Sequence, residues 1–479
     1  MKKFVNKKNL FVLVIVLLAT IFLSFLIKES VERTIFIFLT LFIWLSIFLY
    51  TKDLVLSSLL YILIVLPFNV TMQLPLTVEI FNTQILFPPP FVNGIYVNYL
   101  VPTISIIDIS IILFLLSLLI QKGLSFYWEI FKNIKNGLFI FLLYLIIQNI
   151  FLSNLLNTFN SFRIFFYLLA IISSVIYYKE KNLRKLLFPA SFIFFLNVLV
   201  QGVIGLTQVL RGASLGLKFL GESQVVSGMQ GSSFITLGGR AFLRAYGTFS
   251  HPNVFAGFLI LAILIGIACS RKFSGLGISL IILSFCFLLL TFSRSALLLG
   301  LLILIILLVR GVYKARSEMF SITPLLFLER FGNLLEGGDS SWTERVALFK
   351  ASMEVIKENF LLGTGVGNFV RAMGDYSPRT SRGILLLQPV HNIFVLTFAE
   401  LGIFGFLGFF YILVRTFLEN VKKVTYFKVA VLLSILIIGF WDHYLFSLPQ
   451  GLAIFMFLYL LLVLDLDSLD NYEKDVDKD

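Results

Sequence analysis

The sequence predicts an all-α fold, a polytopic bundle of about 12 transmembrane helices, and two observations carry that prediction. Hydrophobic residues make up 59% of the 479-residue chain and charged residues only 13%, a balance that excludes a soluble globular protein. Apolar runs of about 17 to 22 residues, long enough to cross a bilayer, also follow one another closely. We therefore expect a single transmembrane domain over residues 1–465 and an acidic cytoplasmic tail over residues 466–479.

The apolar runs give the expected spans in order. The first, residues 10–27, follows four lysines and lacks a small-residue cleavage site, so it is predicted to be an uncleaved helix with a cytoplasmic N-terminus. The other spans are expected near 35–50, 54–70, 103–120, 137–153, 161–178, 187–210, 252–270, 274–292, 295–310, 391–414, 427–443 and 450–464.

The formal net charge of +12 reflects membrane topology and argues against a nucleic-acid partner, because lysine and arginine gather in particular loops. The loops at 122–135, 179–185 and 271–272 are basic and therefore cytoplasmic, which places 71–102 and 211–251 outside. One crossing is missing between the basic residues near 310–316 and an external interval at 317–390. The short stretch near 320–331 is the only candidate for it.

The external interval 317–390 is expected to contain an amphipathic helix lying on the membrane surface. Its apolar residues recur at steps of three and four, with charged residues between them: Val346, Phe349, Met353, Ile356 and Phe360. The sequence GTGVGNF that follows lacks the lysine and the strand-turn-helix context of a phosphate-binding loop. It is predicted to be a tight turn that ends the helix.

The three histidines of the chain, His251, His391 and His443, lie at the water-facing ends of apolar runs. Ionisable groups are costly in hydrocarbon, so their gathering at one membrane surface indicates a reaction centre there. His391 is suited to take a proton from a hydroxyl group. For His443 and the neighbouring Asp442, a capping and interfacial role is expected, with a place in the same cavity as the alternative.

Arginines approach two of these helix ends. Arg240 and Arg244 precede a helix start where Ser250 is the expected N-cap and Pro252 suits the first turn. Arg294 lies at a tight hairpin between two apolar runs. Guanidinium groups grip phosphate or diphosphate in a bidentate way, although contact with lipid headgroups and snorkelling to the interface are the alternatives.

Glycine also recurs after His391. Gly402, Gly405 and Gly408 follow at every third residue and are expected to allow close helix packing. Glu400 falls on the opposite helical face from His391, so it is not expected to orient the imidazole.

The order of these motifs resembles the O-antigen ligase and O-antigen polymerase-like family of polytopic membrane glycosyltransferases. The resemblance covers roughly residues 200–460 and lies in four elements: Arg244-x-x-Gly-Thr-Phe-x-His-Pro-Asn, Ser-Arg294-Ser at a helix start, the segment from Glu344-Arg345 to GTGVGNF, and His391-Asn392 followed by Gly402-x-x-Gly405. Family members usually cross the membrane once more after the Ser-Arg helix, where this chain has at most a very short span.

The resemblance implies an inverting glycosyltransferase of the cytoplasmic (inner) membrane, active on the extracytoplasmic face without metal or cofactor. The donor would be a polyprenyl-diphosphate-linked glycan and the acceptor a glycan, lipid or protein, in lipopolysaccharide or other surface polysaccharide biosynthesis of the cell envelope. Arg244 and Arg294 would hold the diphosphate, and His391, with Arg294, would be catalytic. Arg240 is a further diphosphate candidate, and the secondary candidates are His251, Asn392, Arg345 and His443.

Two alternatives stay open at this point. Ligase and polymerase share the donor chemistry and differ in the acceptor. A transporter or flippase of lipid-linked glycan would also need many helices and a basic cavity, but such proteins show internal repeats and ionisable groups near the bilayer midplane. No repeat is evident in this sequence, and its charged candidates lie at one surface, which favours the enzyme.

Overall fold

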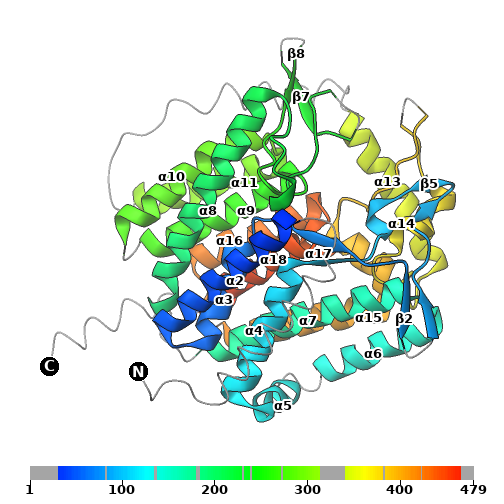
Figure 1. Cartoon of the computed structure of the whole chain (residues 1–479), viewed down its shortest axis with the longest axis horizontal. Coiled ribbons are helices and arrows are strands. Elements are labelled where there is room, and N and C mark those ends of the chain that lie inside the picture. The colour runs from blue at the N-terminus through cyan, green and yellow to red at the C-terminus, as the bar shows by residue number, and fades with distance from the viewer. Residues whose placement is uncertain are drawn as a thin grey trace.

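The computed structural model describes residues 31–464 except 81–82, 134–136, 180–183, 229–230, 238–239, 271–272, 313–339, 381–382 and 422. Within this part the chain is mostly helical, as predicted (Figure 1). Three predicted segments lie outside the described residues: the first span at 10–27, the short stretch at 320–331 and the acidic tail.

Each span predicted within the described residues coincides with a helix. The long helices are α2 (Val31–Thr51), α3 (Leu54–Val65), α4 (Ile106–Lys122), α5 (Leu124–Asn133), α6 (Gly137–Leu152), α7 (Leu155–Tyr178), α8 (Arg184–Arg211), α9 (Pro252–Ser270), α10 (Ser274–Thr291), α11 (Arg294–Val312), α13 (Ser340–Glu358), α15 (Ile393–Asn420), α16 (Tyr426–Trp441) and α18 (Pro449–Val463). The one-turn helices are α14 (Phe369–Ala372) and α17 (Tyr444–Ser447).

The apolar helices make the chain a multi-pass membrane protein. Among the described residues, 6 helices are long and apolar enough to cross a membrane, or up to 7 if the bent pair α4–α5 forms one span. Helices α3, α6, α16 and α18 and the described part of α11 are apolar but shorter. The expected number of about 12 spans therefore stays a prediction.

The core of the bundle lies around α9 and α18, near the centre of Figure 1. Both helices are apolar on all sides and buried along nearly their whole length, which is typical of a helix enclosed by others. Helix α9 packs against α8, α10 and α18. The N-terminal ends of α9 and α15 and the α16–α17 turn meet beside one another, and this junction positions the polar residues described below.

The two intervals expected outside the membrane are not purely loops. The interval 71–102 contains strands β1 (Thr71–Gln73), β2 (Thr77–Ile80), β3 (Thr83–Leu86), β4 (Phe91–Val92) and β5 (Ile95–Tyr96), and the interval 211–251 contains β7 (Phe234–Leu237) and β8 (Arg240–Leu243). Strand β6 (Thr103–Ser105) occupies the beginning of the span predicted at 103–120. The strands form four antiparallel pairs, β1–β6, β2–β3, β4–β5 and β7–β8. The all-α prediction is corrected to this extent, because hydropathy alone does not detect strands this short.

The amphipathic helix predicted in the large external interval is α13. Its buried face is formed by Leu348, Ala351 and Val355, and the helix packs against α15. Phe349 and Phe360, which belong to the predicted apolar stripe, remain exposed. Ile356 of the same predicted stripe is buried, so the face by which the helix docks on the bundle includes part of that stripe.

The glycine-rich turn after α13 packs closely against α15 and so fixes the position of α13. Gly363 and Gly402 both have positive φ, 72° and 63°, and a Cβ added to either would overlap the backbone of the other segment. Gly402 also kinks α15. The amide of Gly365 donates to the Glu400 carbonyl, 2.9 Å away, so this amide binds protein rather than phosphate. The prediction of a helix-ending turn is confirmed.

Candidate active site

Two histidines and an aspartate come together where α15 begins and α16 ends. The Nδ1 atom of His391 lies 3.6 Å from Oδ1 of Asp442, an ion-pair distance slightly longer than a hydrogen bond. The rings of His391 and His443 are 5.3 Å apart between centroids. Asp442 and His443 are buried, and the His391 side chain is 19% exposed. Asp442 is the C-cap of α16, as a capping role predicts, and it also lies in the cluster with His391, which was the stated alternative.

Asn392 fixes this junction. Its Oδ1 accepts hydrogen bonds from the amides of Phe394 (2.9 Å) and Val395 (3.1 Å), which caps α15. Its Nδ2 donates to the carbonyl of Phe440, 3.2 Å away, near the end of α16. The two helix ends are thereby tied together, so Asn392 positions His391 opposite Asp442 and has a structural task of its own.

Asp442 is held as a carboxylate. Its Oδ2 accepts a hydrogen bond from Nδ2 of Asn253 (2.7 Å), and its Oδ1 accepts one from the His443 amide (2.8 Å). Burial alone raises the pKa of a carboxyl, but the contact with His391 and the charge of Arg345 outweigh it and hold the pKa of Asp442 well below its usual range. The cluster therefore contains a buried negative charge.

His443 differs from His391 in its surroundings. Its Nδ1 is 2.6 Å from the hydroxyl of Ser447 in the same turn. Burial lowers the pKa of His443 to about 4, although the Asp442 charge opposes that change. His443 is thus neutral at physiological pH, and it forms a wall of the cluster.

Arg345 brings helix α13 to the same place. Its Nη1 donates to the carbonyl of Trp441, 2.5 Å away, and its guanidinium lies over the Trp441 ring at 6.0 Å. Trp342, one turn earlier on α13, packs against the same ring with centroids 5.9 Å apart. The secondary candidate Arg345 therefore belongs to the cluster and adds positive charge beside Asp442.

Arg244 joins the cluster through Asn253. Its Nη2 donates to Oδ1 of Asn253 (2.7 Å), whose Nδ2 donates in turn to Asp442. Its Nε donates to the carbonyl of Thr291 (2.7 Å), at the end of α10 and three residues before Arg294. Since Arg294 begins α11, the fold brings the two arginines to one hairpin. The side chain of Arg240 lies outside the described part of the structure.

His251 lies beside this chain of contacts but is not arranged as a base. Its Nδ1 accepts a hydrogen bond from the Asn253 amide (3.1 Å), so in the neutral ring the proton is on Nε2, which donates to the Ser233 hydroxyl 2.8 Å away. Burial, followed by the Arg244 charge, lowers the pKa of His251 to about 3. His251, rather than the predicted Ser250, caps α9.

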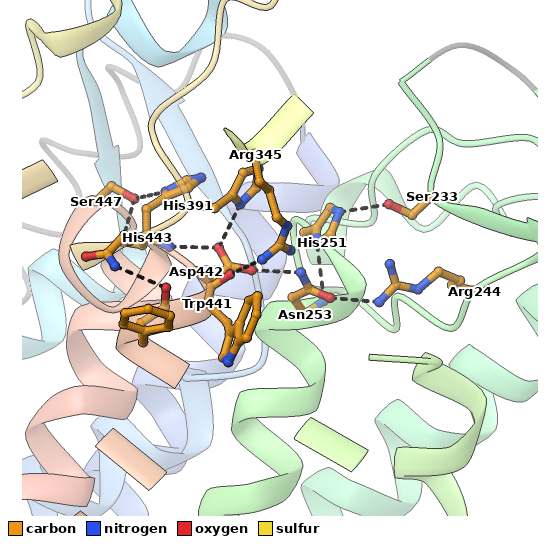
Figure 2. A network of polar contacts seen from close by, with 12 residues as sticks. Ser233, Arg244, His251, Asn253, Arg345, His391, Trp441, Asp442, His443 and Ser447 are labelled. Atoms are coloured by element: carbon orange, nitrogen blue, oxygen red, sulfur yellow. Dashed lines mark hydrogen bonds and ion pairs between the residues drawn. The ribbon is translucent and has the colours of Figure 1, made fainter. Parts of the chain in front are cut away.

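Figure 2 shows the arrangement as one network, with Arg244 at one end, Asp442 in the middle and His443 with Ser447 at the other end. Sequence reasoning selected the histidines and arginines, but it gave no role to Asn253 and undervalued Asp442. Asn253 was visible as the last residue of the His-Pro-Asn motif, and Asp442 directly precedes His443. Only the folded structure shows which of these residues contact one another.

The donor set of His391, Asp442 and His443 could also hold a metal ion, because their ligand atoms lie within 4.8 Å of one another. Its surroundings fit a base better. Both Asp442 oxygens already accept N–H groups, and the neighbouring Arg345 and Arg244 would repel a cation. A carboxylate that faces Nδ1 of a histidine instead prepares the other ring nitrogen to take a proton.

A family comparison connects this geometry with known proteins. The family model described as O-Antigen ligase matches residues 256–410. This part of the chain is similar to the O-antigen ligase family. The match includes Arg294, Arg345, His391 and Asn392, whereas Asp442 lies beyond its end. No curated protein matches the chain at a significant level. The predicted resemblance to the O-antigen ligase-like family is thus confirmed.

Proposed function

We propose that this O-antigen ligase-like protein is an inverting glycosyltransferase of the cytoplasmic membrane, acting on its extracytoplasmic face. It would move a glycan from a polyprenyl-diphosphate carrier to an acceptor hydroxyl. The observation that carries the proposal is the His391–Asp442 pair, a half-buried imidazole whose Nδ1 faces a buried carboxylate. The family match and the membrane-spanning helices support the same reading.

His391 is the proposed base. With its Nδ1 proton directed at Asp442, the Nε2 lone pair accepts the proton of the acceptor hydroxyl. The hydroxyl oxygen then bonds to the anomeric carbon of the donor sugar while the bond from that carbon to the diphosphate oxygen breaks. Asp442 stabilises the imidazolium that forms, and inversion follows because attack and departure occur on opposite faces.

Arginines are the proposed electrophilic partners. The departing diphosphate carries the electron pair of the broken bond, and guanidinium groups lower the energy of that charge. Arg244, held by Thr291 and Asn253, and Arg294, at the start of α11, lie at the α10–α11 hairpin. Arg345 approaches from α13. A diphosphate is a good leaving group once its charge is neutralised, so this reaction needs no second catalytic carboxylate.

A ligase and a polymerase would use the same transfer reaction and differ only in the acceptor. A ligase attaches a complete glycan to a lipid or protein, whereas a polymerase joins repeat units into a longer glycan. We favour the ligase because the matched family model carries that description, and the polymerase of the same family is the alternative.

The test compares surface glycans and lipid carriers in cells with the wild-type protein, with His391→Ala and with no protein. Full-length glycan stranded on its carrier indicates a ligase, and single repeat units indicate a polymerase. Arg294→Lys is expected to weaken transfer because a point charge replaces a bidentate fork. Arg379→Lys, the same substitution at an exposed position of the predicted external interval 317–390, is the matched control. Normal glycan in all strains would refute the proposal.

A further inference from the structure

Tyr99, from the first segment expected outside the membrane, contacts His443, the neighbour of the proposed base His391. The Tyr99 ring packs edge to face against the His443 ring, with centroids 5.9 Å apart, and His443 in turn contacts His391. Tyr99 keeps 41% of its surface exposed. It therefore presents an open aromatic surface next to the proposed base, and it lies outside the part of the chain that matches the family.

The segment around Tyr99 is held in a fixed position. Tyr99 lies in a single 3-10 turn, Asn98–Leu100, whose Leu100 is fully buried. The preceding β4–β5 hairpin is fastened to the α14 region, because Asn93 Nδ2 donates to the Gly374 carbonyl (3.1 Å) and Arg371 Nη2 donates to the Pro89 carbonyl (2.8 Å). An aromatic ring fixed in this way suits stacking, since little side-chain freedom is lost when a ligand binds.

The contacts place the arginine and the tyrosine at opposite ends of the site. Arg244 contacts Asn253, Asn253 contacts Asp442, and Asp442 faces His391. Tyr99 lies beyond them, against His443. In an inverting displacement the acceptor oxygen and the departing diphosphate lie on opposite sides of the anomeric carbon. If the arginine end holds the diphosphate, the tyrosine end is therefore the acceptor side.

We infer that Tyr99 forms one wall of the acceptor subsite and stacks on a pyranose ring of a sugar-bearing acceptor. The inference rests on the proposed glycosyltransferase function and names part of its acceptor site. One face of a pyranose presents several C–H groups, which pack against the π-surface of an aromatic ring, while its hydroxyl groups remain available to polar partners such as His391. Binding here would place one of those hydroxyls beside the base.

The test measures how donor glycan is divided between transfer and hydrolysis. Purified full-length protein is supplied with a lipid extract of cells that lack it, which contains unreacted donor and sugar-bearing acceptor lipid that has not received the donor glycan. Tyr99→Leu is expected to lower the ratio of glycan transferred to glycan released into water by about tenfold, equivalent to about 1.4 kcal/mol of acceptor binding. Tyr99→Phe, which keeps the ring, should stay near the wild-type ratio.

The matched control is Tyr96→Leu, which removes an equally exposed tyrosine of the same segment that packs on Phe91 instead of the histidines. An unchanged ratio in Tyr99→Leu overturns the inference, as does an equal loss in Tyr99→Phe and Tyr99→Leu. An equal fall in transfer and hydrolysis also overturns it, because a structural role affects both. If the unmutated protein forms neither product, the proposed function itself fails, which is visible without any variant.

Discussion

Replacing Asp442 with asparagine isolates the charge of the His391–Asp442 pair. The two side chains have nearly the same shape, so helix packing around the α16–α17 turn should persist. An amide cannot stabilise the imidazolium that forms when His391 takes a proton. The amide also does not favour the tautomer of His391 that carries its proton on Nδ1. In part of the protein molecules Nε2 would then be protonated and could not accept the proton of the acceptor hydroxyl.

The size of the effect follows from the distance. Two unit charges about 4 Å apart, close to the 3.6 Å of this pair, attract by about 4 kcal/mol at an effective dielectric constant of about 20. A transition state that develops the whole imidazolium charge would lose that amount, which is roughly a thousandfold in rate. Asp442→Asn is therefore expected to lower kcat by about 10²- to 10³-fold.

The assay is the initial rate of glycan transfer by purified protein in lipid vesicles, with saturating lipid extract from cells that lack the protein. Glu354→Gln, at an exposed position of α13, is the control for removing a carboxylate charge. Melting curves of both variants separate lost activity from lost folding. If Asp442→Asn is well folded and keeps a rate within about threefold of wild type, the base assignment is wrong.

Three further outcomes test the fold and the chemistry. Burial lowers the pKa of His251 to about 3 and of His443 to about 4, against about 6.5 in the unfolded chain, so the unfolded state binds more protons between these values. The free energy of unfolding should therefore be highest above about pH 6.5 and decrease on acidification, by about 2 kcal/mol per histidine at pH 5. Melting temperatures that do not change over this range would contradict the burial of the two histidines. Gly402→Ala should lower the melting temperature sharply or prevent folding. The backbone conformation there favours glycine, at a cost of roughly 1–3 kcal/mol for another residue, and a Cβ would also overlap Leu361. Wild-type stability of this variant would show that the kink is absent. Treatment with EDTA should leave transfer unchanged, and recovery of lost activity by an added divalent cation would instead support a metal held by His391, Asp442 and His443.

The positions of the helices were predictable because each depends on a local property. A run of apolar residues of sufficient length forms a helix whatever it packs against, which is why the spans from 35–50 to 450–464 coincide with helices. The turn at Gly363–Gly367 was predictable for a similar reason, because it follows an amphipathic helix and lacks the lysine of a phosphate loop. The cap of α9 was predicted at Ser250 and found at His251, one residue away.

The sequence by itself determined the class of the protein, the helices and the residue types that make up the site. The length of an apolar run, the charge of a loop and the position of His391, Arg244 or Arg294 beside an apolar run are properties of short segments, so they can be recognised without knowing what each segment packs against. Only the tertiary structure decided which residues meet. Asp442 faces His391 because Asn392 ties the start of α15 to the end of α16, and Asn253 joins Arg244 to that carboxylate from α9. Such contacts join segments far apart in the chain, so they depend on how whole helices pack and leave no local pattern in the sequence.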